Sequence, residues 1–405
     1  MAGKGLVTII EDDLELVRVL KGLLAHAGYR VTGVTDSTQA LAVLREQRPD
    51  IVILDLLMPQ MDGFTILDMI RRDDEIGATK VIILTGKVFE ADKRRAAELG
   101  ADIYMEKPFE PEELLGKVEQ IMAKKILIRF WGVRGSIASP GPEAIRYGGN
   151  TSCVEVRLPN DQVLIFDAGT GIRTLGNRLI KERKKVKASI FISHPHWDHI
   201  QGLPFFTPAY KVGTELTIYG SEHPDMRLDQ IISAQMESVY FPVQLRSLAA
   251  HITFIPLSEG KYDLKEVGAT LEAVFNNHPG LALAYGIYYG LKKVVYMTDN
   301  ELDPIPQNQW AKYVEFVRSA NLLIHDAQYT EEEYKTKRGW GHSSWPRALA
   351  LAIDGKVERL VLFHHDPDHS DSFVDSIWDE SRSRAAKLGA GMEILAAREG
   401  MEIQI

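Results

Sequence analysis

Six consecutive residues, His194-Pro-His-Trp-Asp-His199, constrain this chain more than any other feature of its sequence. They bring together three imidazoles and one carboxylate directly after an apolar run, residues 188–193, that predicts a buried strand. Titratable groups are costly to bury at a strand end unless they are paired or bind metal. Alternate residues of an extended segment point the same way, so the first two histidines can hold one divalent ion. The aspartate and the third histidine, on the turn that follows, can reach a second ion.

Further candidate ligands stand at the ends of later strand-like runs. His278, Asp299 and the adjacent pair His364 and His365 each come just after an apolar segment. A sheet can aim such strand-end side chains into one shared cleft. Two sets of nitrogen and oxygen ligands with an open position between them suit Zn²⁺, Mn²⁺ or Fe. The sequence therefore predicts a dinuclear site in which a carboxylate bridges the ions.

Composition bounds the other possibilities. The chain has 405 residues, enough for two or three domains. One cysteine, Cys153, fits a reducing cytoplasm, and we find neither a signal peptide nor an apolar run long enough to span a membrane. The net charge is −9; residues 1–124 carry 16 basic and 22 acidic residues (−6) and residues 125–405 carry 31 and 34 (−3). Neither part has the basic excess typical of polyanion binders, so we expect a cytoplasmic protein without a membrane or long nucleic-acid partner.

The chain divides near Lys124 and Lys125. Before this point, strand-like runs alternate with amphipathic helical stretches, which favours a doubly wound parallel sheet. After it come strands with Gly-rich turns, which favour hairpins first and α/β units later. We expect an α/β protein of two domains, residues 1–124 and 125–405. The last helix of the first domain, about residues 111–123, leads almost directly into the first strand of the second.

Polar residues at the strand ends of the first domain predict a phosphoryl-transfer site. Acids occupy positions 11–13 after the first strand, Asp55 ends another strand, Thr85 ends a third, and Lys107 follows later. In a parallel sheet these carboxyl ends converge in one crevice. Two of the acids with Asp55 would bind Mg²⁺, and Asp55 would be the nucleophile that accepts a phosphoryl group. Lys107 would supply the counter-charge and Thr85 a hydroxyl for the new phosphate.

These motifs resemble the receiver domain of two-component response regulators. The resemblance is carried by Ile9-Ile-Glu-Asp-Asp13, Leu54-Asp-Leu-Leu-Met-Pro59, Asp62-Gly63, Leu84-Thr-Gly86 and Lys107-Pro-Phe109. It implies a flavodoxin-like fold, a cognate sensor histidine kinase as partner, phosphorylation at Asp55 and a cis Lys107–Pro108 peptide, and it admits a homodimer. The resemblance implies that Mg²⁺ is bound by Glu11, Asp12 and Asp55. It implies that the switch residues are Thr85, Tyr104 and Lys107.

The order of ligands in the second domain resembles the metallo-β-lactamase fold, and within it the ribonuclease Z-like phosphodiesterase branch. Asp167 in Phe166-Asp-Ala-Gly169 precedes the six-residue motif, and His278, Asp299 and His364 follow it in family order. The resemblance implies an αββα sandwich with two divalent transition-metal ions, zinc ahead of manganese or iron. One ion would be held by His194, His196 and His278, the other by Asp198, His199 and His364, with Asp299 bridging.

Two further motifs resemble that branch. Leu323-Ile-His-Asp326 and Gly341-His-Ser-Ser344 look like its acid and histidine motifs, which makes His342 a proton donor to the leaving oxygen, oriented by Asp326. With Asp198 these form the implied catalytic set. The hairpin-like stretch 127–152 resembles the family's opening segment and would bring Asn150 near the site.

Several points depart from the family or stay open. The chain has no long Gly/Pro-rich basic arm of the kind that tRNA-processing members use, which favours a smaller substrate. His364 rather than its neighbour is the expected ligand because it stands where the strand ends. His365 and His369 are as readily surface residues as not. Trp197 is expected to pack, with a platform for a base as the alternative, and Cys153 to be a buried strand residue.

Three classes of function are compatible with these residues. The leading one is a response regulator whose output domain is a metal-dependent hydrolase, a phosphodiesterase of nucleotide-type or other small phosphodiesters, regulated through Asp55. The second is a lactonase, thioesterase or β-lactam-type hydrolase with the same metals. The third is a non-catalytic domain that binds a ligand, which the full ligand set argues against. A panel of diester, ester, lactone and β-lactam substrates discriminates them.

Overall fold

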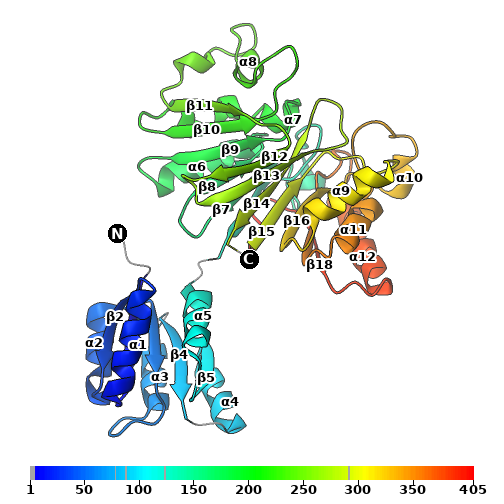
Figure 1. The fold of residues 1–405 in the computed structure, drawn as a ribbon. Helices are drawn as coiled ribbons and strands as arrows, with labels where there is room; N and C mark the ends of the chain where they lie inside the picture. The colour runs from blue at the N-terminus through cyan, green and yellow to red at the C-terminus, as the bar shows by residue number, and fades with distance from the viewer. Residues whose placement is uncertain (1–4, 78, 87–88, 123–124, 291) are drawn as a thin grey trace. The chain divides into compact units, whose positions relative to one another are not determined.

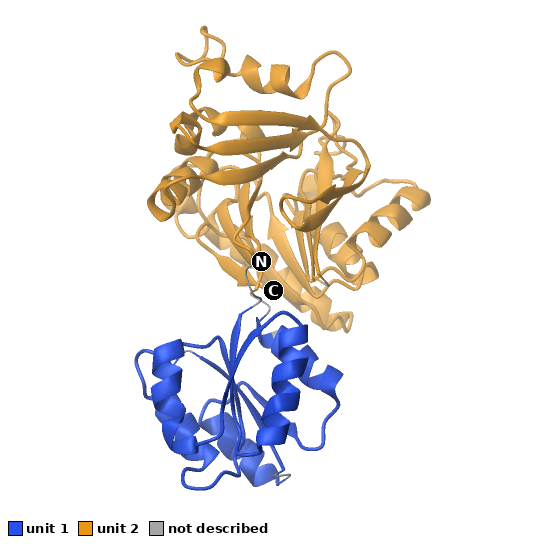
Figure 2. Ribbon diagram, turned by 60° about the vertical axis from the view of Figure 1, so that its left-hand side comes forward, with its two compact units in different colours: residues 1–124 blue, residues 125–405 orange. Residues whose placement is uncertain are grey.

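The chain forms two compact units, residues 1–124 and 125–405, in a computed structural model that describes residues 5–77, 79–86, 89–122, 125–290 and 292–405 (Figure 2). Each unit has its own hydrophobic core. None of the helices within the described ranges is long and apolar enough to cross a membrane.

The first unit is a five-stranded parallel sheet in the order β2-β1-β3-β4-β5 (Figure 1). Its strands are β1 (Leu6–Ile10), β2 (Arg30–Val34), β3 (Ile51–Leu54), β4 (Lys80–Thr85) and β5 (Ile103–Glu106). Its helices are α1 (Leu14–His26), η1 (Ser37–Gln39), α2 (Ala40–Gln47), α3 (Gly63–Arg71), α4 (Glu90–Glu98) and α5 (Pro111–Met122). The expected doubly wound receiver fold is confirmed.

Apolar residues on both faces of the sheet divide the helices into two layers. Val7 and Ile9 of β1 pack with α1 and α5, whereas Ile10, Val52 and Leu54 pack with α2, α3 and α4. The chain reverses its direction across the sheet between β1 and β3, because β2 lies on one side of β1 and β3 on the other. A crevice forms at the carboxyl ends of the strands at such a switch point.

The second unit contains two seven-stranded sheets. The first has the order β11-β10-β9-β8-β7-β6-β19, with β6 (Leu127–Gly132), β7 (Cys153–Arg157), β8 (Val163–Phe166), β9 (Lys187–Ile192), β10 (Glu215–Gly220), β11 (His251–Pro256) and β19 (Glu402–Gln404). The second runs in sequence order: β12 (Gly260–Leu264), β13 (Ala269–Phe275), β14 (Leu283–Tyr289), β15 (Lys292–Met297), β16 (Leu322–Asp326), β17 (Arg359–Phe363) and β18 (Glu393–Ala396). Antiparallel hairpins open each sheet along the chain and parallel pairs follow.

Helices cover the outer faces of the two sheets (Figure 1). Helix α6 (Gly171–Glu182) packs on the first sheet, and α9 (Gln307–Val317), α11 (Trp345–Asp354) and α12 (Asp371–Lys387) pack on the second. A core rich in aromatic and branched side chains fills the space between the sheets. The remaining short helices are α7 (Trp197–Ile200), α8 (Leu228–Ala234), α10 (Glu331–Tyr334) and the 3₁₀ turns η2 (Pro142–Ala144), η3 (Leu203–Phe205), η4 (Thr207–Tyr210) and η5 (Leu245–Ser247). The expected αββα sandwich is confirmed.

Candidate metal centre

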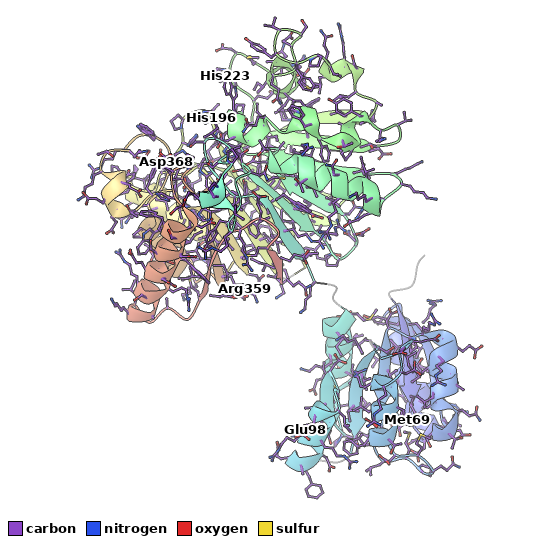
Figure 3. The ribbon with its side chains drawn as sticks, turned by 180° about the vertical axis from the view of Figure 1, so that it is seen from behind. Met69, Glu98, His196, His223, Arg359 and Asp368 are labelled. Atoms are coloured by element: carbon purple, nitrogen blue, oxygen red, sulfur yellow. The ribbon has the colours of Figure 1, made fainter. Side chains whose placement is uncertain are left out.

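The six-residue motif begins where β9 ends, and the other candidate ligands leave the ends of neighbouring strands. Phe166 of β8 pairs with Phe191 of β9, which brings Asp167 to the start of the motif. On the second sheet, Asp299 follows β15 and His364 follows β17, and both strands pair with β16 in parallel. Because the strands end at one edge, side chains distant in sequence meet there. Figure 3 shows His196 in this region of the second unit.

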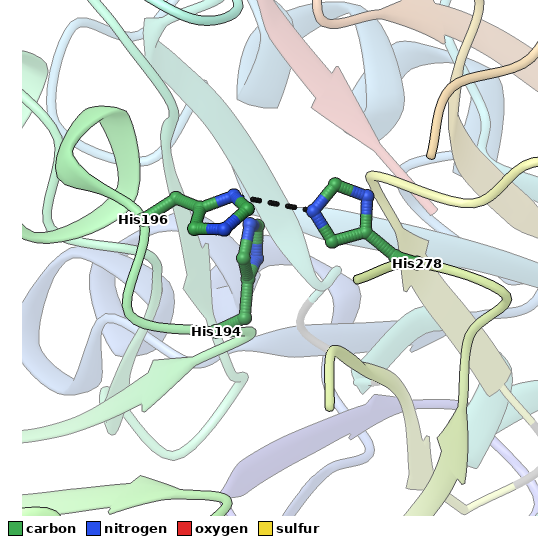
Figure 4. A group of neighbouring side chains, drawn as sticks. All are labelled: His194, His196 and His278. Atoms are coloured by element: carbon green, nitrogen blue, oxygen red, sulfur yellow. Dashed lines mark hydrogen bonds between the residues drawn. The ribbon is translucent and has the colours of Figure 1, made fainter. Parts of the chain in front are cut away.

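The structure brings the seven predicted ligands into two groups. His194, His196 and His278 form the first group, with one nitrogen of each ring within 4.8 Å of the others. His196 Nδ1 and His278 Nε2 are 3.2 Å apart, and the His194 ring lies beside both (Figure 4). The second group contains, by the same measure, Asp198, His199, Asp299 and His364.

The carboxylate of Asp299 connects the two groups. Its Oδ2 lies 3.6 Å from His194 Nε2 and 4.0 Å from His278 Nε2. Its Oδ1 lies 3.4 Å from His199 Nε2 and 3.2 Å from His364 Nε2. Each oxygen therefore faces a different histidine group, which is the arrangement that a carboxylate bridging two cations requires.

Two buried ring nitrogens without hydrogen-bond partners indicate whether these residues fit metal ions. His194 Nε2 and His199 Nε2 are fully buried and make no hydrogen bond within the described part of the chain. Buried polar atoms almost always have a partner, so an orphaned pair aimed at one carboxylate is informative. Imidazole nitrogens with carboxylates are the donors that Zn²⁺, Mn²⁺ and Fe²⁺ accept. The residues present fit a pair of divalent transition-metal ions.

The other ring nitrogens are held from behind. His199 Nδ1 lies 2.7 Å from Asp167 Oδ2, and His194 Nδ1 lies 3.1 Å from Ser193 Oγ. His278 Nδ1 lies 2.9 Å from the carbonyl oxygen of Gly341, and His364 Nδ1 lies 3.0 Å from Gln328 Oε1. Each acceptor fixes the orientation of its ring and the tautomer that leaves Nε2 free to bind.

Three residues of this site have a strained backbone. Asp167, Asp299 and His364 have φ of 60°, 51° and 61°, in the left-handed region that non-glycine residues seldom adopt. Such conformations cost of order 1 kcal/mol or more each and are tolerated where surrounding contacts over-determine them. Asp and His are among the side chains that enter this region most readily. The three turns redirect side chains at strand ends toward the ligand groups.

Burial and charge set the protonation of the site. Burial lowers the pKa of His194 and of His278, which keeps their rings neutral, the form that binds metal. Burial opposes protonation of His199 as well, but Asp198, Asp299 and Asp167 together raise its pKa well above the usual value. A metal ion at this position therefore competes with a proton.

The expected acid and histidine lie against the second group. His342 Nδ1 is 3.0 Å from Asp326 Oδ2, and His342 lines a cleft of about 530 Å³ together with Asp198 and Asp299. Burial tends to lower the pKa of His342, but the carboxylates of Asp326, Asp299 and Asp198 together outweigh it and raise the pKa to about 9. Asp326 is itself fully buried at the end of β16.

A glycine and a buried glutamate shape the loop that carries His342. Gly341 has φ +87°, and a Cβ on it would lie 2.0 Å from His278 Nδ1, so only glycine fits. Glu301 accepts hydrogen bonds from the backbone nitrogens of Gly339 (2.7 Å) and Gly341 (2.9 Å) and from Tyr334 Oη (2.5 Å). It thus fixes the carbonyl that orients His278.

Several of these residues escape sequence reasoning. Asp167 was placed only by family order; its part in holding His199 comes from the structure. Gln328 and Glu301 follow Asp326 and Asp299 by two residues, a spacing that could have marked them. Ser193 is the last residue before the motif. None of the four was predicted to orient a ligand.

The structure corrects the expectation for Trp197 and decides the burial of two histidines that the sequence left open. Trp197 does not pack, because 80% of its surface is exposed and it lines the cleft. His365 and His369 are not surface residues: both are buried, with His365 Nε2 2.8 Å from the carbonyl oxygen of Ala397 and away from the ligand groups. The side chain of Asn150, which was expected near the site, donates a hydrogen bond to Glu399 Oε2 (2.9 Å). Cys153 is buried in β7, as expected.

In the first unit the predicted acids and lysine meet in the crevice. One carboxylate oxygen each of Glu11, Asp12 and Asp55 lies within 4.8 Å of the other two. Lys107 Nζ lies 2.6 Å from Glu11 and 2.7 Å from Asp55, and the Lys107–Pro108 peptide is cis. Burial lowers the pKa of Lys107, but its two carboxylate partners more than offset this and raise it. Burial raises the pKa of Glu11.

The remaining receiver residues also take definite places. Asp13 accepts hydrogen bonds from the backbone of Glu15 and Leu16 and caps α1, so it is not one of the clustered acids. Thr85 is fully buried at the end of β4, and Tyr104 is partly buried on β5. A Cβ on Gly63 would lie 2.2 Å from the carbonyl oxygen of Asp55, which explains the Asp62-Gly63 motif.

Comparison with known families identifies both units. A family model described as the response regulator receiver domain matches residues 7–119. A second model, the beta-lactamase superfamily domain, matches residues 162–365, just over half of the chain. The chain belongs to the β-lactamase superfamily. Its N-terminal unit is a response regulator receiver domain.

Relatives and solved structures cover the two units separately. The probable transcriptional regulator ycf27 of Guillardia theta is 35% identical over 118 residues, 29% of this chain and 45% of that protein. The chain thus spans about half the length of the curated relatives it matches. The metallo-β-lactamase-fold protein YhfI of Bacillus subtilis (19% identity, TM-score 0.52) aligns with 69% of this chain and 99% of its own. A diphosphatase of the PhnP family (17% identity, TM-score 0.50) aligns with 70% and 98% and shares the same fold.

Proposed function

We propose that this superfamily member is a response regulator whose output domain is a dinuclear metal-dependent phosphodiesterase, controlled by phosphorylation of Asp55. The observation that carries the proposal is the division of Asp299 between two histidine groups, one on each carboxylate oxygen. Beside it stands a histidine, His342, hydrogen-bonded to a buried acid, Asp326. A metal pair with an adjacent proton donor is suited to displacing an alkoxide from phosphorus.

The first ion would be held by His194, His196 and His278. The second would be held by Asp198, His199 and His364, with Asp299 shared. Bound there, the two ions would supply Lewis-acid activation of water and neutralise charge on the phosphoryl oxygens. Zinc suits this donor set best, with manganese or iron as alternatives.

Residues of the chain itself would orient the catalytic groups and protonate the leaving oxygen. Asp326 orients the His342 ring through Nδ1, which leaves Nε2 to give a proton to the departing oxygen. The backbone nitrogen of Ser136 donates to Asp198 Oδ2 (2.7 Å) and fixes that carboxylate at the cleft. A cleft of about 530 Å³ is of the size that binds a small ligand, so we propose a nucleotide-type or other small phosphodiester as substrate.

In the receiver domain, Glu11 and Asp12 would hold Mg²⁺ beside Asp55, which would accept a phosphoryl group from a sensor histidine kinase. Lys107 already contacts Asp55 and would stabilise the phosphoryl oxygens. Thr85 and Tyr104 would report the change as the receiver's switch residues, and a homodimer is one form the response can take.

A substrate panel tests the proposal. Bis(4-nitrophenyl) phosphate, 4-nitrophenyl phosphate, 4-nitrophenyl acetate, a γ-lactone and nitrocefin are each given to the protein loaded with Zn²⁺, Mn²⁺ or Fe²⁺. The expected result is turnover of the diester far above that of the monoester and of the three carboxyl substrates. Turnover of a lactone or ester above the diester would replace the phosphodiesterase with a carboxyl hydrolase on the same metals.

A further inference from the structure

One exposed tryptophan lines the cleft at the candidate metal centre, and a second lies near it in sequence. Of its six tryptophans, only Trp197 and Trp340 are exposed, with 80% and 58% of their surface accessible. Trp197 stands between His196 and Asp198, and Trp340 two residues before His342. A large apolar ring that is exposed to water adds little to the stability of the fold, so an exposed tryptophan at a candidate site is a candidate for ligand binding.

The two rings differ in their surroundings. Trp197 lines the same cleft as Asp299 and His342, and it begins the short helix α7. Both of its chain neighbours are candidate ligands, so its backbone is fixed by the metal centre while the ring stays at the rim. Trp340 does not line the cleft, and its ring already has a cation partner: Lys337 Nζ lies 4.8 Å from the ring centroid.

We propose that Trp197 determines specificity by stacking on the base of the substrate, which makes the substrate class a nucleotide phosphodiester. The inference rests on the proposed phosphodiesterase function. An indole offers a flat, uncharged face that stacks on any base, and it gives much less to an alkyl chain. The cleft of about 530 Å³ is large enough for one nucleotide whose phosphate reaches Asp299 and His342.

Two diesters with one leaving group isolate the contribution of the base. Thymidine 5′-(4-nitrophenyl phosphate) and methyl 4-nitrophenyl phosphate both release 4-nitrophenolate and differ only in the retained group. The native protein should prefer the thymidine ester in kcat/KM by about 5- to 150-fold, mainly through KM, the range expected for stacking of one base. Trp197→Leu should remove this preference, and Trp197→Phe should keep most of it.

Trp340→Ala is the matched control, since it removes an exposed tryptophan near His342 that does not line the cleft; it should leave the preference unchanged. Binding of thymidine 5′-monophosphate, measured by calorimetry, should weaken in Trp197→Leu and not in Trp340→Ala. An equal preference in native protein and Trp197→Leu, or equal losses on both esters, overturns the stacking role. Failure of the native protein to cleave either ester counts against the proposed function instead, and the binding measurement still decides the role of Trp197.

Discussion

The two sites of this protein hold negative charge in different ways. In the receiver crevice, Glu11 and Asp55 share Lys107, a cation of the chain itself, and Asp12 is exposed to solvent. In the cleft of the candidate metal centre, Asp198 and Asp299 are buried among histidines, and no lysine or arginine pairs with either among the described residues. Lys107 offsets part of the negative charge in the crevice without an ion, whereas in the cleft only protons or bound cations can offset the charge of the two carboxylates.

This difference suggests how each site is used. A carboxylate crevice with its own lysine can take up Mg²⁺ weakly and release it, which suits a switch that is phosphorylated and dephosphorylated. Histidine rings held from behind by Asp167, Ser193, Gln328 and Gly341 are preorganised, which suits ions that stay bound. Four predictions test this contrast between an exchangeable and a resident ion.

The largest effect is expected from Asp198→Ala. This change should remove one transition-metal ion and reduce diester turnover by about 10³-fold or more, because the Lewis acid supplies several kcal/mol of transition-state stabilisation. Asp12→Ala, the corresponding loss of a carboxylate in the crevice, should leave basal turnover unchanged. Metal analysis and steady-state rates check both variants; equal effects on turnover would erase the distinction between the sites.

Replacing His342 comes next. His342→Ala should reduce kcat by roughly 10²–10⁴-fold on diesters with an alkoxide leaving group, the usual range for a lost general acid. The loss should be much smaller with 4-nitrophenolate, which leaves without a proton. Rates on one ester of each kind suffice, and a uniform loss on both would assign His342 to positioning.

A smaller effect is expected from the acid behind His199. Asp167→Asn leaves shape unchanged but replaces an oxygen that accepts from His199, Ser193 and Tyr296. We expect transition-metal affinity to fall by about 10- to 100-fold. The matched control is Glu155→Gln. Glu155 is also a buried carboxylate, but it pairs with Arg157 and Trp131, so this variant should keep the metal affinity. Competition with a chromogenic chelator measures both, and unchanged affinity in Asp167→Asn would show that the ring needs no support from behind.

The smallest effect is the regulatory one. Helix α5 ends at Met122 and β6 begins at Leu127, so the last helix of the receiver is close in sequence to the first strand of the second unit. Beryllofluoride with Mg²⁺ should mimic phosphate at Asp55 and change turnover or self-association at least about 5-fold, the lower end of allosteric couplings. Asp55→Ala should lose this response and keep basal activity.

Steady-state kinetics and sedimentation, each with and without beryllofluoride, measure turnover and oligomeric state and so test for this response. If the mimic binds and neither rate, KM nor oligomeric state changes, the receiver acts by localising the enzyme through a partner.

Strand-end polar residues made most of both sites predictable from sequence. Asp55, His278 and Asp299 each follow an apolar run. Parallel strand pairs account for the places of Asp55 and Asp299, whereas His278 follows β13, which pairs antiparallel with its neighbours. The choice of His364 over His365 followed from the strand's end, and the structure places only His364 in the cluster.

The features that could not be predicted from the sequence are side-chain exposure and contacts between residues far apart in the chain. Packing was preferred to a base platform for Trp197, but its ring is exposed and lines the cleft. Glu301 and Gln328 read as ordinary polar residues, because their partners Gly341 and His364 lie 40 and 36 residues away. Left-handed φ values at Asp299 and His364 carry no sequence signal beyond residue types that tolerate them.

The central claim is that this chain carries a resident pair of transition-metal ions besides an exchangeable Mg²⁺. The direct measurement is the metal content of the purified protein after passage through a desalting column in Mg²⁺-free buffer, with diester turnover recorded on the same sample. The account predicts about two transition-metal ions per chain, little Mg²⁺, and an active enzyme. A transition-metal content near zero with turnover intact would contradict it.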